Sequence, residues 1–185
     1  MTSQDKLFTI DEKGYLPNAK KIESPNYDSR SPKQTISLIV IHCISLPPNK
    51  FGNSFIEDFF LNNLDISEHT YFKKIKDLKV SSHFLIKRKG ELIQFVSCLN
   101  KSWHAGESSW KNKKNCNDFS IGIELEGSDL IKYEDIQYNV LIKLLKSLRM
   151  KYPITDIVGH SDIAPGRKTD PGIFFDWNLI NAEKI

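Results

Sequence analysis

The chain has 185 residues, of which 39% are hydrophobic and 26% are charged, a composition typical of a globular protein with one hydrophobic core. Its net charge of +3 is small and its lysines are spread along the whole chain, so we expect no nucleic-acid partner. No apolar stretch is long enough to cross a bilayer, so we expect no membrane association either.

Two further features indicate the compartment. The polar N-terminus lacks the apolar core of a secretory signal. The three cysteines, Cys43, Cys98 and Cys116, are odd in number and include no CxxC pair, which argues against a disulfide framework. We therefore expect a cytoplasmic protein.

The chain begins with a polar segment. Residues 1–35 contain three prolines, which predicts an extended N-terminal arm packed on a single domain of residues 36–180. Residues 36–42 are then a nearly continuous run of β-branched and apolar side chains, typical of a strand buried on both faces. Pro47 and Pro48 end this strand.

Short helices and a hairpin are predicted next. Ser54 is a candidate cap for a helix that runs to Phe60, and a second short helix is predicted over residues 68–75. Residues 82–88 and 91–96 flank a Lys-Gly turn and predict a β-hairpin.

Residues 120–126 alternate between apolar and other side chains. This spacing predicts a strand with its isoleucines and its leucine on one face and with Gly122, Glu124 and Glu126 on the other. If the second face looks into a cleft, one of its carboxylates is suited to transfer protons. The alternative is an ordinary solvent-exposed polar face, and the pattern does not choose between Glu124 and Glu126.

The last third of the chain predicts a long helix and a final strand. Apolar residues recur at helical spacing over residues 133–151, Glu134 and Asp135 begin the helix, and Pro153 stops it. Residues 154–160 can return as a strand. Because helices and strands are interleaved irregularly, we predict a mixed α/β fold in which helices flank a central mixed β-sheet.

Residues 159–172 hold an unusual density of charged groups between turn-forming Pro-Gly pairs, which predicts a loop of fixed shape rather than a helix or strand. His160 begins this loop and Asp170 lies near its end, while His42 ends the first buried strand. Two imidazoles and one carboxylate suit catalytic zinc, because they leave a fourth position open for water. The alternative for a lone histidine such as His42 is a side chain at the edge of the core whose hydrogen bonds are satisfied there.

Other candidates have equally simple alternatives. An ammonium at Lys168 can stabilise an oxyanion, although Arg167 competes for this role and either can be an ordinary surface residue. Trp103 and His104 precede small residues and can line a groove for a sugar or peptide, or pack in the core. Asp162 is expected to order the loop by bonding backbone amides.

Four segments resemble the zinc N-acetylmuramoyl-L-alanine amidases. They are residues 40–48 (VIHCISLPP), 103–106 (WHAG), 116–127 (CNDFSIGIELEG) and 159–172 (GHSDIAPGRKTDPG). The similarity is strongest to the members that act on 1,6-anhydro-N-acetylmuramoyl peptides in the cytoplasm during cell-wall recycling. It extends from about Ser24 to about Trp177, and the last segment is highly specific.

The resemblance implies a role for each matched residue. Zn²⁺ would be held by His42, His160 and Asp170. The catalytic carboxylate falls on Glu124 rather than Glu126, and the lysine beside the metal falls on Lys168. The family fold is a mixed β-sheet with helices packed around it, shared with the peptidoglycan recognition proteins.

The implied reaction is hydrolysis of the amide that joins the lactyl group of anhydro-muramic acid to L-alanine of the stem peptide. The anhydro-muropeptide would contact Trp103, His104 and Lys79, and no obligate protein partner is implied. This sequence departs from well-known members at three positions. Cys43 stands where an asparagine is expected, and Lys79 and Asn115 stand where arginines hold the stem-peptide carboxylate. Lys79 keeps the charge but loses the bidentate fork of arginine.

Three other functions remain open at this level. A peptidoglycan-binding module would grip the muropeptide without cutting it, and loss of a zinc ligand would mark that class. An exported or phage-type amidase would act on intact wall. A non-enzymatic zinc-stabilised protein would use a closed set of four ligands, for which Cys43 is the nearest thiol.

Overall fold

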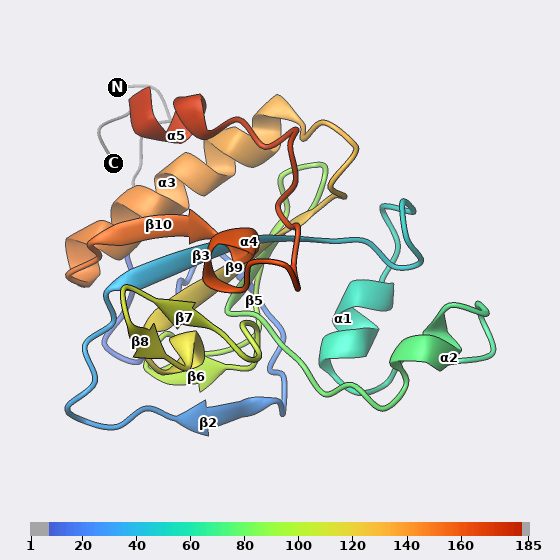
Figure 1. The fold of residues 1–185 in the computed structure, drawn as a ribbon, viewed down its shortest axis with the longest axis horizontal. Coiled ribbons are helices and arrows are strands. Elements are labelled where there is room, and N and C mark those ends of the chain that lie inside the picture. Colours follow the sequence, from blue (N-terminus) through green and yellow to red (C-terminus); the bar gives the residue numbers. More distant parts are fainter. Residues whose placement is uncertain (1–7, 183–185) are drawn as a thin grey trace.

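The computed structural model describes residues 8–182, and its centre is a six-stranded mixed β-sheet (Figure 1). Neighbouring strands run parallel except β4 and β5, which form the predicted hairpin. The predicted fold class is therefore confirmed. Across the sheet the strands are β1 (Lys20–Lys21), β5 (Leu92–Gln94), β4 (Phe84–Ile86), β9 (Ser120–Glu126), β3 (Leu38–Ile44) and β10 (Asp156–Gly159).

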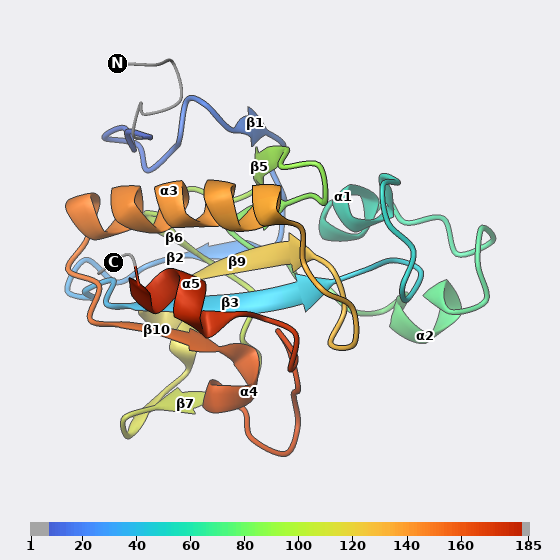
Figure 2. The same ribbon diagram turned by 90° about the horizontal axis from the view of Figure 1, so that it is seen from above.

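Helix α3 (Asp135–Lys151) covers one face of this sheet, and α5 (Trp177–Ala182) contributes to the same apolar cluster (Figure 2). A capping box between Glu134 and Gln137 satisfies backbone groups at the start of α3. The leucines of α3 pack against the isoleucines of β3 and β9. The helix predicted over residues 133–151 is confirmed, with its first turn beginning at residue 135.

The other face of the sheet carries two small sheets and a short 3-10 helix, η1 (Cys116–Asp118). In these sheets β2 (Tyr27–Ser29) pairs with β6 (Asn100–Ser102), and β7 (Ser109–Trp110) pairs with β8 (Lys113–Lys114). Every residue of β9 is buried. The solvent-exposed polar face considered for residues 120–126 is therefore wrong. His104, from the chain between β5 and β9, covers Ser120 and Gly122, and the Glu126 carboxylate is bound by loops at Gly52 and Arg88.

Two short helices lie beyond the carboxyl ends of β3 and β9 (Figures 1 and 2). They are α1 (Phe55–Phe60) and α2 (Phe72–Ile75). Ser54 precedes α1, but its hydroxyl donates to the Asp58 carboxylate at 3.0 Å instead of capping the backbone. The second helix is shorter than predicted, because the His69 side chain accepts the Tyr71 backbone N–H and holds a turn there.

The loop predicted to be free of helix begins with one helical turn, α4 (His160–Ile163), so that part of the prediction is wrong. The Asp162 carboxylate accepts the Gly159 backbone N–H at 2.7 Å, as expected for a loop-ordering side chain, and this bond caps the turn. The turn starts directly where β10 ends. His160 is therefore held by both elements.

The described part of the predicted N-terminal arm, residues 8–35, packs on the rest of the chain. Ile10 and Leu16 are buried in the same cluster as α3, β1 extends the central sheet and β2 pairs with β6. Residues 1–7 of that prediction lie outside the described residues. No helix within residues 8–182 combines the length and the apolar character needed to span a membrane.

Candidate active site

Parallel pairing brings the predicted site residues to one edge of the sheet. His42 on β3 lies directly opposite Glu124 on β9, and His160 follows β10 on the other side of β3. Carboxyl ends of parallel strands meet at the same edge, where open α/β sheets commonly bind ligands. Residues that lie far apart in the sequence therefore converge here.

The two histidines and Asp170 form a compact triangle. Their closest atoms are 3.0 Å apart between the two Nδ1 atoms, and 3.1 Å from each Nδ1 to Oδ2 of Asp170. His42 and His160 are 2% and 3% exposed. Within residues 8–182 this is the group with the residue types and spacing to hold a metal ion.

His160 presents an unprotonated nitrogen to this triangle. Its Nε2 lies 3.1 Å from the Ala105 carbonyl oxygen, which can only accept a hydrogen bond. Nε2 therefore carries the proton, and in a neutral ring Nδ1 keeps its lone pair. A metal ligand needs that lone pair, and a hydrogen bond from the second nitrogen to a carbonyl is the usual support for a metal-bound histidine.

Electrostatics keep the other two members in the forms that bind a cation. Burial lowers the pKa of His42 to about 4, so its ring is neutral at pH 7. Burial alone would raise the pKa of Asp170, but hydrogen bonds with His160 and His42 outweigh it and lower that pKa, so the carboxylate is ionised. Two imidazole nitrogens and one carboxylate are a donor set that fits catalytic Zn²⁺, which takes three protein ligands and leaves a fourth position for water.

Glu124 and Glu126 lie on the same face of β9 but in different surroundings. Glu126 accepts the backbone N–H groups of Gly52 at 2.6 Å and Arg88 at 2.9 Å, so it holds two loops. Among the described residues, Oε2 of Glu124 is buried without a hydrogen-bond partner. Burial and then the nearby Asp170 carboxylate raise the pKa of Glu124 well above its usual value, which suits a group that accepts and returns a proton.

These groups open into a cleft of about 290 Å³. The polar side holds the triangle, Glu124 and the exposed Lys168. The facing wall comes from α1, α2 and the chain that leads to β4. We call it the apolar wall, and in the cleft it consists of Phe59, Phe60, Tyr71, Ile75, Leu78 and Val80.

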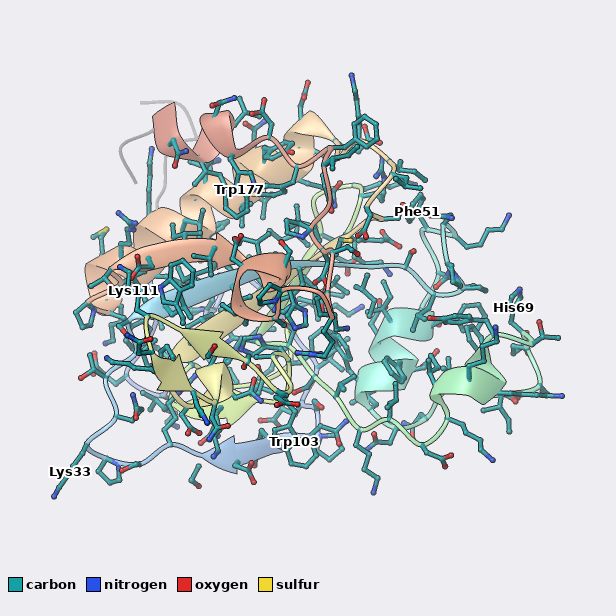
Figure 3. The ribbon with its side chains drawn as sticks, in the orientation of Figure 1. Lys33, Phe51, His69, Trp103, Lys111 and Trp177 are labelled. Atoms are coloured by element: carbon teal, nitrogen blue, oxygen red, sulfur yellow. The ribbon has the colours of Figure 1, made fainter. Side chains whose placement is uncertain are left out.

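Several predicted residues lie outside this cleft. Trp103 lies beside β2, where its indole N–H donates to Asp28 at 2.9 Å (Figure 3). Lys79 is exposed between two residues of the apolar wall. Asn115 and Arg167 border a neighbouring hollow, and the Arg167 guanidinium donates to the carbonyls of Ala105 and Glu107. Arg167 is thus engaged elsewhere, whereas Lys168 lines the cleft.

His104 borders the cleft, but both of its ring nitrogens face other protein groups. Nδ1 is 2.9 Å from Nε2 of His42, and Nε2 is 2.9 Å from the Ser120 hydroxyl. Ser120 was not predicted as a site residue. The alternation of β9 was the available signal, because it places Ser120 on the same face as Gly122 and Glu124.

Comparisons with known proteins show what this chain is similar to. The family model described as N-acetylmuramoyl-L-alanine amidase matches residues 32–173. The 1,6-anhydro-N-acetylmuramyl-L-alanine amidase AmpD of Citrobacter freundii is 46% identical over 173 residues, which is 92% of each chain.

Two solved structures extend the comparison. A crystal structure of a selenomethionine derivative of AmpD has a TM-score of 0.90 and 46% identity, over 93% of this chain and 97% of that chain. The amidase AmiD from Escherichia coli was solved with the substrate anhydro-N-acetylmuramic acid-L-Ala-D-γ-Glu-L-Lys. It has a TM-score of 0.59 and 28% identity, over 95% of this chain and 65% of that chain.

Proposed function

Because the chain belongs to the N-acetylmuramoyl-L-alanine amidase family, we propose that it is a zinc enzyme of cell-wall recycling. It hydrolyses the amide between the lactyl group of 1,6-anhydro-N-acetylmuramic acid and L-alanine of the stem peptide. Zn²⁺ is held by His42, His160 and Asp170. The observation that carries this proposal is the convergence of these three residues with Glu124 in one cleft.

The metal supplies one kind of chemistry: bound Zn²⁺ polarises a carbonyl and lowers the pKa of water from about 15.7 to about 7. Glu124 then acts as the proton carrier. Its unpartnered Oε2 takes the proton from the attacking water and later gives it to the departing alanine nitrogen. One carboxylate can serve both steps because the proton that it accepts is the one that it returns.

Lys168 supports the same reaction from the rim of the cleft. Burial and Asp170 raise the pKa of Glu124, and the Lys168 ammonium partly offsets this rise, so its positive charge acts on the same cleft. Negative charge develops on the carbonyl oxygen when water adds, and a preorganised cation stabilises it. The apolar wall holds the sugar and peptide beside these groups and limits the access of water.

The composition of the cluster favours catalysis over the alternatives. A non-catalytic binding module would lack a ligand, whereas all three are present together with Glu124. A closed structural site would include a thiolate, but the Cys43 thiol donates to the Asp129 carboxylate at 3.3 Å. The substrate class follows from the similarity to AmpD and to AmiD with its anhydro-muropeptide. Three free thiols fit the reducing cytoplasm as the site of action.

Mass spectrometry of purified protein incubated with anhydro-muropeptide tests this function. We expect release of the intact stem peptide, loss of activity after treatment with a chelator, and recovery on addition of Zn²⁺. A protein that binds the muropeptide but releases no peptide after zinc loading would be a binding module. Undiminished cleavage in the chelated, metal-free protein would contradict zinc dependence.

A further inference from the structure

A chain of polar groups runs behind His42, away from the cleft. It begins at Nε2 of His42, passes through both nitrogens of His104 to the Ser120 hydroxyl, and ends at the Cys116 carbonyl. The four groups lie within β3, β9 and the covering segment between β5 and β9. Their contacts fix where each proton lies.

The fixed end of the chain is the Cys116 carbonyl. It lies 2.6 Å from the Ser120 hydroxyl oxygen, and two oxygens approach this closely only with a proton between them. The carbonyl has none, so the hydroxyl proton points to it. The Ser120 oxygen is then free to accept a hydrogen bond from its other neighbour.

That neighbour is Nε2 of His104, at 2.9 Å, which must therefore be the protonated nitrogen. The His104 ring is buried, and its two nitrogens face an imidazole and a hydroxyl rather than a carboxylate, so the neutral ring with one proton fits this place. Its Nδ1 consequently holds a lone pair. That lone pair faces Nε2 of His42 at 2.9 Å and accepts its proton in a hydrogen bond.

We infer that His104 and Ser120 are positioning residues that hold the proton of His42 on Nε2 and thereby direct the lone pair of Nδ1 into the ligand triangle. The inference rests on the proposed zinc site and deepens it. His160 holds its proton on Nε2 by a direct hydrogen bond to the Ala105 carbonyl. His42 instead depends on His104 and Ser120, which we call the relay. Without the relay, Nδ1 of His42 would carry the proton and donate it to Asp170, 3.1 Å away.

The surrounding chain is shaped to hold His104 in this place. A Cβ atom at Gly122 would lie 2.5 Å from Cγ of His104, so only glycine leaves room for the ring on β9. The Asn117 side chain accepts the backbone N–H groups of His104 and Ala105 at 3.2 and 2.8 Å. The two adjacent residues that contact His42 and His160 from behind are therefore anchored by one side chain.

Nitrogen-15 NMR of the full-length, metal-free protein reads the histidine tautomers directly. We expect His42 and His104 to carry their protons on Nε2 in the wild type. Ser120→Ala removes the acceptor of His104, so both rings should shift toward the Nδ1–H form without loss of folded structure. Nδ1–H at His42 in the wild type, or tautomers unchanged in Ser120→Ala, would overturn the inference.

Zinc affinity, measured by competition with a chromophoric chelator, gives the second test. His104→Phe keeps an aromatic ring but removes the acceptor, and we expect it to weaken zinc binding by about 10- to 100-fold. His104→Asn is the matched control, because its Oδ1 can replace Nδ1 as acceptor, and it should restore most of the affinity. Equal losses in the two variants would mean that the ring matters only for packing and would overturn the relay.

The zinc site and the relay can be rejected separately. Absence of zinc binding by the wild-type protein would reject the proposed metal site, whatever the tautomers are. Wild-type zinc binding with an Nδ1–H His42 in the metal-free state would keep the enzyme but reject the relay. If His104→Phe does not fold, the comparison of Ser120→Ala with the wild type decides, because this change removes a single oxygen.

Discussion

On the sheet side of the cleft, each group proposed to act in the reaction is attached to a strand or to the loop that follows β10. The opposite side is the apolar wall, which comes from two short helices and the chain that leads to β4. His42 and His160 are almost fully buried, and each of their ring nitrogens faces a named partner. In the apolar wall, Leu78 is 53% exposed and Tyr71 is half-buried. Phe59, Phe60 and Ile75 of the same wall are buried in a core cluster, so it is the exposed part of the wall, at Leu78, that we expect to tolerate change.

The largest effect is expected on the sheet side, from Asp170→Ala. This change leaves two imidazoles without the carboxylate, so bound zinc and amidase activity should both fall to background. Metal analysis after gel filtration and the muropeptide assay measure the two losses. Asp162→Ala is the matched control in the same loop. Its carboxylate caps a backbone N–H, so it should cost only about 1 kcal/mol of stability and keep the metal.

Glu124→Gln separates proton transfer from metal binding. We expect the turnover rate to fall by about 10²- to 10⁴-fold with the zinc content unchanged, since the amide cannot carry the proton. Glu126→Gln, on the same face of β9, should affect thermal stability more than rate, because Glu126 accepts backbone N–H groups of two loops. A Glu124→Gln enzyme with normal turnover would reject this residue as the proton carrier.

A smaller loss is expected at the rim of the cleft. Lys168→Met keeps most of the side-chain length but removes the charge, and it should lower kcat by about 10²- to 10³-fold. KM should change little if the ammonium acts mainly on the developing oxyanion. A rise in KM of about 10²- to 10³-fold with an unchanged kcat would instead mean that Lys168 acts in binding the substrate before the reaction.

The smallest effect is expected on the apolar wall. Leu78→Ala removes an exposed, cleft-lining side chain, so it should raise KM by about fivefold, or about 1 kcal/mol of lost apolar contact, and leave kcat unchanged. Steady-state kinetics with anhydro-muropeptide distinguish the two constants. If kcat falls as far as in Lys168→Met, the wall takes part in assembling the reactive groups, and the contrast between the two sides does not hold.

Local patterns in the sequence predicted the sheet side of the cleft well. The apolar run before His42 and the alternation around Glu124 reflect burial, which is encoded at each strand residue. The spacing rules left open whether Glu124 or Glu126 meets the cleft. That difference depends on which loops reach each carboxylate, here through Gly52 and Arg88, and these residues lie far away in the sequence.

The apolar wall and the hydrogen bonds that hold His42 and His160 could not be predicted in the same way. Trp103 and His104 are neighbours in the sequence, yet Trp103 bonds to β2 and His104 bonds to His42, because the chain turns between the two small sheets and the central one. The helical turn that begins at His160 depends on the Asp162 carboxylate, which accepts the Gly159 backbone N–H, and not on periodicity. Such features arise from tertiary contacts, for which one sequence carries no direct signal.

A crystal structure of the zinc-loaded protein, with anomalous diffraction recorded on both sides of the zinc absorption edge, would locate the metal. We expect one strong zinc-specific peak bonded to Nδ1 of His42, Nδ1 of His160 and Oδ2 of Asp170, with no fourth ligand from the protein. A peak elsewhere, or a site completed by the Cys43 thiolate, would contradict the proposed zinc site.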